Sequence, residues 1–154
     1  MRYLLGIDLG TTGLKAVIFD LGGRPLGKGF AANKYLPGPP GWAEQDPRAW
    51  WNGCCVAIQA ALAEAQVDPA DIAGVGVCGF HHCPVFLDAD GEPARPTIVT
   101  HDSRLGESLA DLQQSGTLDQ IIEISGSRVM TGHFPPIYHL VQRSDRKALD
   151  RTRW

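Results

Sequence analysis

Short apolar runs separated by glycine-rich turns divide the first part of the chain into three predicted strands. Tyr3-Leu4-Leu5 leads into a turn rich in glycine and threonine, and Leu14 to Phe19 leads out of it. A second turn, Gly22-Gly23-Arg24, is followed by the run Pro25 to Ala32. Runs of this length bounded by glycine are typical of β-strands joined by tight turns. The pattern therefore predicts an antiparallel meander over residues 3–32.

A long helix and a different kind of strand follow the meander. The loop Pro37 to Gly41 is too rich in proline to be helical. Asp46 and Pro47 then form a good cap and first residue for a helix that runs to about Gln66. Apolar side chains recur along this helix at helical spacing, namely Trp50, Trp51, Cys54, Ile58, Ala61 and Leu62. The small apolar run Gly74 to Gly79 is typical of a buried parallel strand that is reached by a helical crossover.

The second half of the chain carries shorter elements. Strands are predicted at Val85 to Asp88 and at Thr97 to Thr100. Helices are predicted from the residues after 103 to about Gln114, over 117–124 and over 136–149. Strands that alternate with helices indicate an α/β fold with a mixed sheet. The length of 154 residues argues for one domain with a sizeable core.

Composition and charge narrow the classes of function. The chain is 44% hydrophobic and 20% charged and has a net charge of −3, so it gives no electrostatic footprint for nucleic acid or for a membrane surface. No stretch is apolar for long enough to cross a bilayer, and the sequence opens on a strand rather than a secretory leader, so we expect a cytoplasmic protein. The four cysteines fit neither a zinc spacing nor a disulfide framework, and we expect them to be buried free thiols.

The turn Gly6-Ile7-Asp8-Leu9-Gly10-Thr11-Thr12-Gly13 carries the most chemistry. Its glycines let backbone amides approach a ligand closely, its threonine hydroxyls can donate to phosphate oxygens, and the Asp8 carboxylate can hold a hydrated divalent cation. It is not a helix-capping P-loop, because no Gly-Lys-Ser/Thr closes it and a strand follows. The alternative is an ordinary β-hairpin whose turn happens to be rich in glycine and threonine.

Two further polar clusters follow predicted strand ends, where ligands of open α/β sheets bind. His81-His82 can hydrogen-bond a polyhydroxylated ligand or can be structural, and zinc is disfavoured because no third ligand has a fitting spacing. His101-Asp102-Ser103-Arg104 offers a carboxylate and a guanidinium that together can fix several hydroxyls. The alternative for this second cluster is a helix cap with a surface salt bridge.

Four motifs, in this order, resemble the N-terminal domain of the FGGY carbohydrate kinases, and the xylulokinase-like branch in particular. They are the turn at residues 6–12, Trp42-Ala43-Glu44-Gln45-Asp46-Pro47 before a Trp-Trp helix, Gly79-Phe80-His81-His82, and His101-Asp102-Ser103-Arg104. The resemblance extends over essentially the whole chain. It implies a ribonuclease-H-like, actin-like ATPase domain with a mixed five-stranded sheet and helices on both of its faces.

The resemblance also implies roles for individual residues. Asp8 would lie beside Mg²⁺ and the attacked γ-phosphate of ATP, and would hold the metal indirectly. The phosphate-binding residues would be Gly10, Thr11, Thr12 and Gly13. The substrate-binding residues would be His81, His82, Asp102 and Arg104.

The sequence departs from the xylulokinase-like pattern at three places. Phe80 and His81 replace Gln-Met, His101 and Ser103 replace Asn and Gly, and Ile137 replaces a lysine. A reshaped substrate pocket is therefore expected. FGGY kinases have a second actin-like domain, and by analogy the general base and the adenosine-binding segments lie beyond this chain.

The resemblance thus predicts the N-terminal part of an ATP-dependent sugar or polyol kinase. Its partners would be the small-molecule substrate and the missing C-terminal kinase domain, and a homodimer is left open. Because phosphoryl transfer depends on positioning and charge stabilisation, this part alone should catalyse little. Two rival interpretations are a truncated, non-catalytic remnant or sugar-binding or interaction module, and an actin-like ATPase that acts on a protein partner.

Overall fold

The computed structural model describes residues 2–154, and the chain forms two compact units. The first unit extends to Lys34 and continues over Arg48–His81. The second unit comprises Tyr35–Pro47 and His82–Trp154. Each unit buries its own cluster of apolar side chains.

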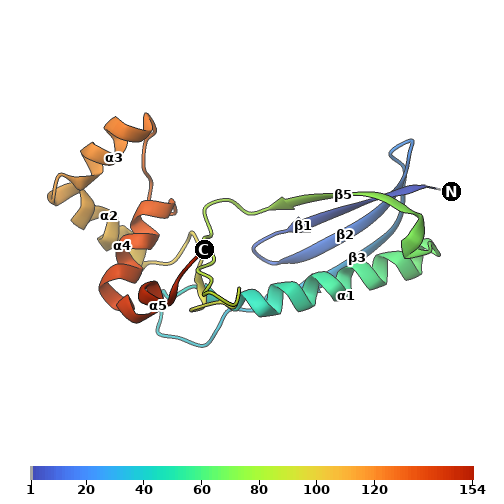
Figure 1. The fold of residues 1–154 in the computed structure, drawn as a ribbon, viewed down its shortest axis with the longest axis horizontal. Coiled ribbons are helices and arrows are strands. Elements are labelled where there is room, and N and C mark those ends of the chain that lie inside the picture. The colour runs from blue at the N-terminus through green and yellow to red at the C-terminus, as the bar shows by residue number, and fades with distance from the viewer. Residues whose placement is uncertain (1) are drawn as a thin grey trace. The chain divides into compact units, whose positions relative to one another are not determined.

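A four-stranded mixed sheet forms the first unit (Figure 1). Its strand order is β3-β2-β1-β5, in which β2 runs antiparallel to both β1 and β3 whereas β5 runs parallel to β1. The predicted meander and the parallel strand after the helix are both confirmed. The strands are β1 (Tyr3–Leu9), β2 (Gly13–Asp20), β3 (Pro25–Ala32) and β5 (Ile72–Gly79).

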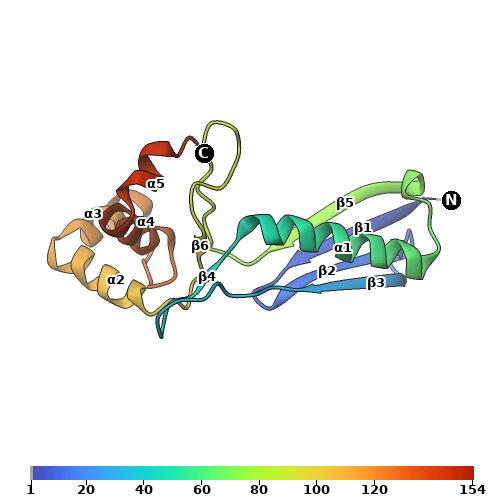
Figure 2. The same cartoon turned by 90° about the horizontal axis from the view of Figure 1, so that it is seen from below.

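Helix α1 (Pro47–Ala65) lies along one face of this sheet, and a short 3-10 turn, η1 (Pro69–Asp71), connects it to β5 (Figure 2). The helix approaches β3 so closely that a Cβ atom on Gly29 would lie 1.9 Å from the carbonyl oxygen of Ala57. The other face of the sheet carries no helix of this unit among residues 2–154. The buried core between helix and sheet comprises Leu5, Ala16, Ile18, Ala57 and Ala61.

The second unit is mainly helical. A two-stranded antiparallel sheet joins β4 (Glu44–Gln45) to β6 (Thr97–Ile98). Four helices follow in the chain, α2 (Arg104–Gln114), α3 (Thr117–Ser125), α4 (Phe134–Ser144) and α5 (Arg146–Arg151). The core of the unit comprises Phe86, Ile98, Leu105, Ile137 and Val141. Within residues 2–154, no helix has the length and hydropathy needed to cross a membrane.

The prediction of a fifth strand in the main sheet is wrong, although the predicted α/β class and mixed sheet are confirmed. Residues 97–98 pair with β4 in the separate small sheet, so the main sheet has four strands. The strand expected at 85–88 is reduced to a single bridge between Leu87 and Pro93. A ladder cannot extend there, because Pro93 has no N–H and the Leu87 carbonyl accepts instead from Arg153 and Trp154.

Three further expectations from the hydrophobic pattern are wrong. The helix expected over 136–149 is split at Asp145, whose backbone is not helical and whose side chain accepts from the N–H of Ala148 to cap α5. Trp50 is buried on α1, but Trp51 is 71% exposed although both were expected on the apolar face. Strand β5 is largely exposed rather than buried, because within residues 2–154 it is an edge strand that pairs with β1 alone.

Candidate functional site

The turn between β1 and β2 is held by hydrogen bonds to its own backbone. The N–H of Gly10 donates to the carbonyl of Gly13 at 3.0 Å. Asn33 binds the turn twice, since its side-chain amide donates to the Gly10 carbonyl at 2.8 Å and its backbone N–H donates to the Thr12 carbonyl at 3.0 Å. A Cβ atom on Gly13 would lie 2.5 Å from the Phe30 ring, so only glycine fits there. The turn therefore has a fixed backbone, and Thr12 at its tip is exposed.

Asp8 faces Lys15 across the hairpin. The two residues are register partners, and Asp8 Oδ2 lies 3.6 Å from Lys15 Nζ. Both side chains are about half exposed, so the pair contributes little to stability and both charges can reach a ligand. Sequence reasoning missed Lys15, although its place one register step from the turn and opposite Asp8 is a signal that could have found it. A carboxylate, an ammonium and a glycine–threonine turn together can bind a phosphate with its hydrated cation.

A direct, all-protein metal site is absent from the part of the chain that the structure describes. No three His, Cys, Asp or Glu side chains in residues 2–154 gather closely enough to hold a metal ion. Asp8 fits a different arrangement, in which one carboxylate and phosphate oxygens bind a Mg²⁺ ion that keeps several waters. The exposed carboxylate beside the turn is compatible with that arrangement.

The two predicted histidines fall in different units. His81 is exposed at the end of the first unit, and His82 is exposed at the start of a segment of the second unit. His82 has a φ of 58°, in the left-handed region that is costly for a residue with a side chain. Its ring stacks on that of His133, with centroids 4.1 Å apart. His133 is the residue before α4, and sequence reasoning missed it because no local pattern links it to His82.

Three segments of the second unit converge around Thr100. A Cβ atom on Gly132 would lie 2.8 Å from the Thr100 Cβ, so the turn before α4 is pressed against this residue. Burial raises the pKa of the Cys83 thiol to about 11, and a backbone hydrogen bond with Thr100 opposes that shift only in part. His82 and His133 are the chain neighbours of Cys83 and Gly132, which both contact Thr100. The backbone on either side of the stacked imidazoles is therefore held by packing around Thr100.

Asp102 is the most heavily engaged of the predicted substrate residues. Its side chain is fully buried. Oδ1 accepts from the backbone N–H and from Nε of Arg104 at 3.0 and 2.8 Å, and Oδ2 accepts from the N–H of Ala43 and from Nη2 of Arg104, both at 2.7 Å. Burial alone would raise the pKa of Asp102, but these hydrogen bonds outweigh it and hold the pKa below its usual range. Since its oxygens are already bound, this carboxylate orients Arg104.

Arg104 is held from three sides. Besides Asp102, its Nη2 donates to Glu44 Oε1 at 2.7 Å, and its guanidinium lies 3.7 Å from the ring centroid of Trp42. Glu44 also accepts from Arg95 at 2.9 Å. Nη1 of Arg104 makes no hydrogen bond within residues 2–154. The two N–H groups of this nitrogen are therefore left, in a fixed plane, to donate to a ligand. The surface salt bridge considered as an alternative for this cluster is therefore a buried network.

Sequence reasoning missed Glu44, Arg95 and Trp42 as members of this network. Glu44 and Trp42 belong to the motif at residues 42–47, which contributed to the family resemblance but was given no chemical role. Because Glu44 is sixty positions from Arg104 in the chain, no local pattern links the two. The charges of Glu44 and Arg95 near predicted strand ends could have indicated this network. The signal is weak, because charged residues at such places are usually solvated.

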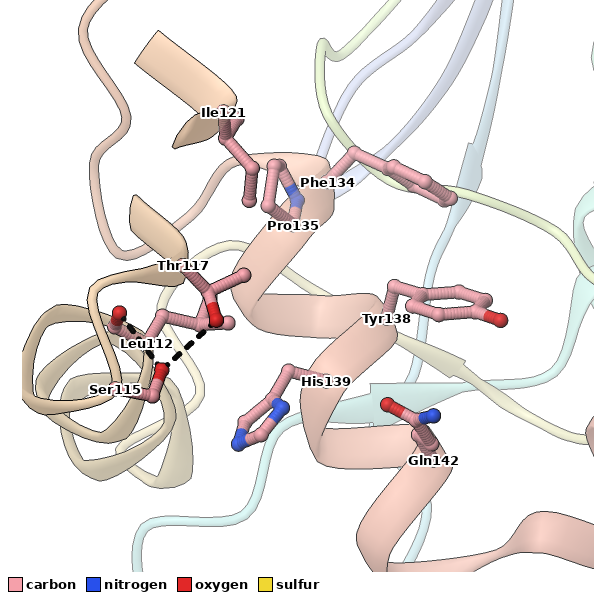
Figure 3. Close-up of a pocket in the computed structure, with 9 residues that line it drawn as sticks. All are labelled: Leu112, Ser115, Thr117, Ile121, Phe134, Pro135, Tyr138, His139 and Gln142. Carbon is pink, nitrogen blue, oxygen red and sulfur yellow. Dashed lines mark hydrogen bonds between the residues drawn. The ribbon is translucent and has the colours of Figure 1, made fainter. Parts of the chain in front are cut away.

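A cavity of about 580 Å³ in the second unit lies apart from the predicted residues (Figure 3). Helices α2, α3 and α4 line it, mostly with apolar side chains, and Ser115 hydrogen-bonds Thr117 and the Leu112 carbonyl at its rim. None of the residues predicted to bind phosphate or substrate lines this cavity.

Comparison with known proteins places these features in a family. Residues 3–153, which span both units, match the model of the N-terminal domain of the FGGY family of carbohydrate kinases. A glycerol kinase of Thermococcus gammatolerans is 34% identical over 114 residues, which are 73% of this chain and 23% of that protein. A probable L-xylulose kinase of Haemophilus influenzae is 29% identical over 94% of this chain and 30% of its own length.

A solved structure, described as a xyloylose kinase from Brucella ovis, is similar over 99% of this chain and 31% of its own. Its TM-score is 0.86 at 32% identity. The chain thus spans less than a third of the length of the relatives it matches. The similarity in sequence and in fold agrees with the resemblance that the four motifs carry. The chain belongs to the FGGY family of carbohydrate kinases, whose N-terminal domain it matches.

Proposed function

We propose that this chain is the N-terminal part of an ATP-dependent kinase that phosphorylates a hydroxyl of a sugar or polyol. The observation that carries the proposal is the turn between β1 and β2, whose fixed backbone presents an exposed threonine beside the accessible Asp8 and Lys15. Relatives named glycerol kinase and probable L-xylulose kinase support a small polyhydroxylated substrate.

The phosphate side of the reaction is assigned to the hairpin. Bound ATP with Mg²⁺ would supply the phosphoryl group and part of the charge neutralisation. Asp8 would orient the hydrated metal, and Thr11, Thr12 and the amide of Gly13 would orient the phosphate. Gly10, whose N–H is bound to the Gly13 carbonyl, would let the turn approach the phosphate closely. Lys15 adds a positive charge near the same oxygens. Because the turn is already fixed by Asn33, these groups need little rearrangement to bind phosphate.

The substrate side is assigned to the second unit and to His81. Arg104 offers the two N–H groups of Nη1 to substrate hydroxyls, and Asp102 and Glu44 hold its plane in place. His82, oriented by its stack on His133, is a second hydrogen-bonding group. We assign Asp102 to positioning rather than direct contact, because both of its oxygens already accept hydrogen bonds from protein groups.

The partner of this chain is the remaining part of an FGGY kinase, which supplies the general base and the adenosine-binding segments. The relatives' greater length supports this assignment. Residues 1–154 by themselves are therefore expected to give no sugar-dependent ATP turnover.

The test is a chimera in which residues 1–154 replace the matching segment of the Brucella ovis kinase. Thermal shift against pentuloses, hexuloses and polyols identifies the ligand, because a ligand that binds only the folded state raises the melting temperature. Asp8→Ala should then lower sugar-dependent ADP release at least about a hundredfold, since it removes a charge that orients the reacting group. The exposed turn residue Asp90 is the matched control, and Asp90→Ala should leave the rate unchanged. Undiminished turnover in Asp8→Ala would contradict the assignment.

A further inference from the structure

Residues 35–42 of the second unit are fixed at both ends to the short stretch of chain that precedes α2. At the first end, the Tyr35 hydroxyl lies 3.0 Å from Nε2 of His101, and the two rings meet edge to face with their centroids 5.6 Å apart. At the second end, the carbonyl of Gly41 accepts from the N–H of Ser103 at 2.9 Å. Both anchors thus lie beside the carboxylate network that was described above.

The backbone between the two anchors is stiff. Three prolines lie between them, and each proline fixes its own φ. The N–H of Trp42 donates to the carbonyl of Pro39 at 3.1 Å, and Gly41 has a φ of 87°, which is typical of a type II turn. A Cβ atom on Gly41 would lie 2.2 Å from Ser103 Oγ, so this turn packs closely against Ser103. The position of the anchors is therefore passed on to Trp42.

Trp42 ends this segment and covers one face of Arg104. The guanidinium carbon lies 3.7 Å from the centroid of the Trp42 ring, which is the geometry of a cation–π contact. Asp102 and Glu44 accept from Nε and Nη2 in the plane of the guanidinium. Within residues 2–154, the donors left for a ligand are those of Nη1, and the Trp42 ring decides from which face a ligand reaches them.

We propose that residues 35–42 are a positioning element for Arg104, in which the contact between Tyr35 and His101 keeps the Trp42 ring over the guanidinium. Tyr35 and Trp42 are each 46% exposed, so burial alone does not hold the segment and its anchors have to do so. The element fixes the direction from which substrate hydroxyls approach Nη1. This inference rests on the proposed function, which assigns Nη1 to the substrate.

A double-mutant cycle in the chimera with the Brucella ovis kinase tests the positioning, with glycerol and L-xylulose as the probes. Tyr35→Phe removes the hydroxyl and keeps the ring. It should raise KM about threefold to tenfold and leave kcat within about twofold, because a group that only binds substrate acts equally on the ground state and the transition state. His101→Ala should do the same, and the double variant should be no worse than either single variant.

Two controls separate positioning from other roles of these residues. His101→Gln should keep the native KM, because its amide oxygen can accept from the Tyr35 hydroxyl near the place of Nε2. Tyr138→Phe, on α4 and 41% exposed, should change neither KM nor kcat. An unchanged KM in Tyr35→Phe overturns the proposal, and so do additive effects in the cycle, which would mean that His101 contacts the substrate by itself.

Hydrogen exchange tests the anchors without measuring turnover. The amides of Trp42 and Ser103 donate to carbonyls of the segment, so their exchange reports whether it stays in place. Both amides should exchange about threefold to tenfold faster in the Tyr35→Phe chimera. Unchanged exchange overturns the proposal whether or not the chimera is active. A chimera that phosphorylates neither probe but loses this protection in Tyr35→Phe would reject the proposed function alone.

A pair of glycines gives a second variant for the same measurement. Gly41→Ala should release the amide of Ser103, because the added Cβ would meet Ser103 Oγ. Gly91→Ala is the matched control, since Gly91 also has a positive φ, 79°, but a Cβ there would meet nothing within 4 Å. Equal exchange of the Ser103 amide in the two variants overturns the proposal.

Discussion

Replacing Asp102 with alanine tests the buried network most directly. The fully buried carboxylate accepts hydrogen bonds from the N–H of Ala43 and from the backbone N–H, Nε and Nη2 of Arg104. Its loss leaves two backbone donors without their acceptor and removes one of the two carboxylates that hold the guanidinium. Glu44 and Trp42 remain in contact with Arg104.

The structure sets the size of the expected effect. Removing one partner of a buried ion pair costs about 3–5 kcal/mol, because the other charge stays buried and uncompensated. Glu44 still compensates Arg104, so we expect the lower end of that range, about 3 kcal/mol of unfolding free energy. The matched control is Asp150→Ala, which breaks an exposed pair with Arg146 and should cost less than about 1 kcal/mol.

Urea unfolding followed by circular dichroism measures the loss, and hydrogen exchange of the α2 amides assigns it to the second unit. The pKa of Asp102 lies below its usual range when folded, so its contribution is present above the unfolded carboxyl pKa of about 4 and is lost as the pH falls through the folded value. The difference between the native chain and Asp102→Ala should therefore be full at neutral pH and shrink in acid. A loss no larger than that of Asp150→Ala, or one that grows in acid, would refute the reasoning.

Two further predictions concern packing and thiol chemistry. Gly29→Ala should destabilise the first unit by about 1–3 kcal/mol in urea unfolding, because its Cβ would lie 1.9 Å from the Ala57 carbonyl oxygen. Gly76→Ala, where nothing lies within 4 Å, should change stability by less than about 1 kcal/mol, and equal losses would show that the close approach is unimportant. Iodoacetamide at pH 8, read by peptide mass spectrometry, should modify exposed Cys78 at least about tenfold faster than Cys83, whose pKa burial raises to about 11. Faster labelling of Cys83 would contradict the burial of its thiol.

All four cysteines were expected to be buried, and their exposure shows which property the hydrophobic pattern does not determine. All four cysteines are free, as predicted, but the expected burial is wrong: Cys54, Cys55 and Cys83 are half-buried and Cys78 is exposed. Its strand looks like a buried parallel strand in sequence, because small apolar residues are typical of strands covered on both faces. In residues 2–154 the strand is at the edge of the sheet and pairs with β1 alone, and a position at the edge cannot be recognised from the local sequence.

The residues of the candidate site also differ in whether the sequence alone could indicate them. The hairpin residues could be proposed as a site from the sequence because Asp8, the glycines and the threonines are adjacent, and the strands that flank them signal the turn. Lys15, Glu44 and His133 were missed because their partners are distant in the chain or lie on the facing strand. Asp102 was predicted to bind substrate, but its hydrogen bonds favour positioning Arg104 over the direct contact with substrate that the resemblance implied.

The sequence by itself determined the elements whose causes are local. Apolar alternation and glycine turns specify the meander of β1, β2 and β3, and Asp46-Pro47 with helical spacing specifies α1. The tertiary structure alone decided that residues 97–98 join β4, that Trp51 faces outward from α1 while Trp50 is buried, and that Arg104 is bound by Glu44. The physical reason is that local conformation depends on neighbours a few residues away. Strand pairing, burial and charge compensation depend on groups that the fold brings together from distant parts of the chain.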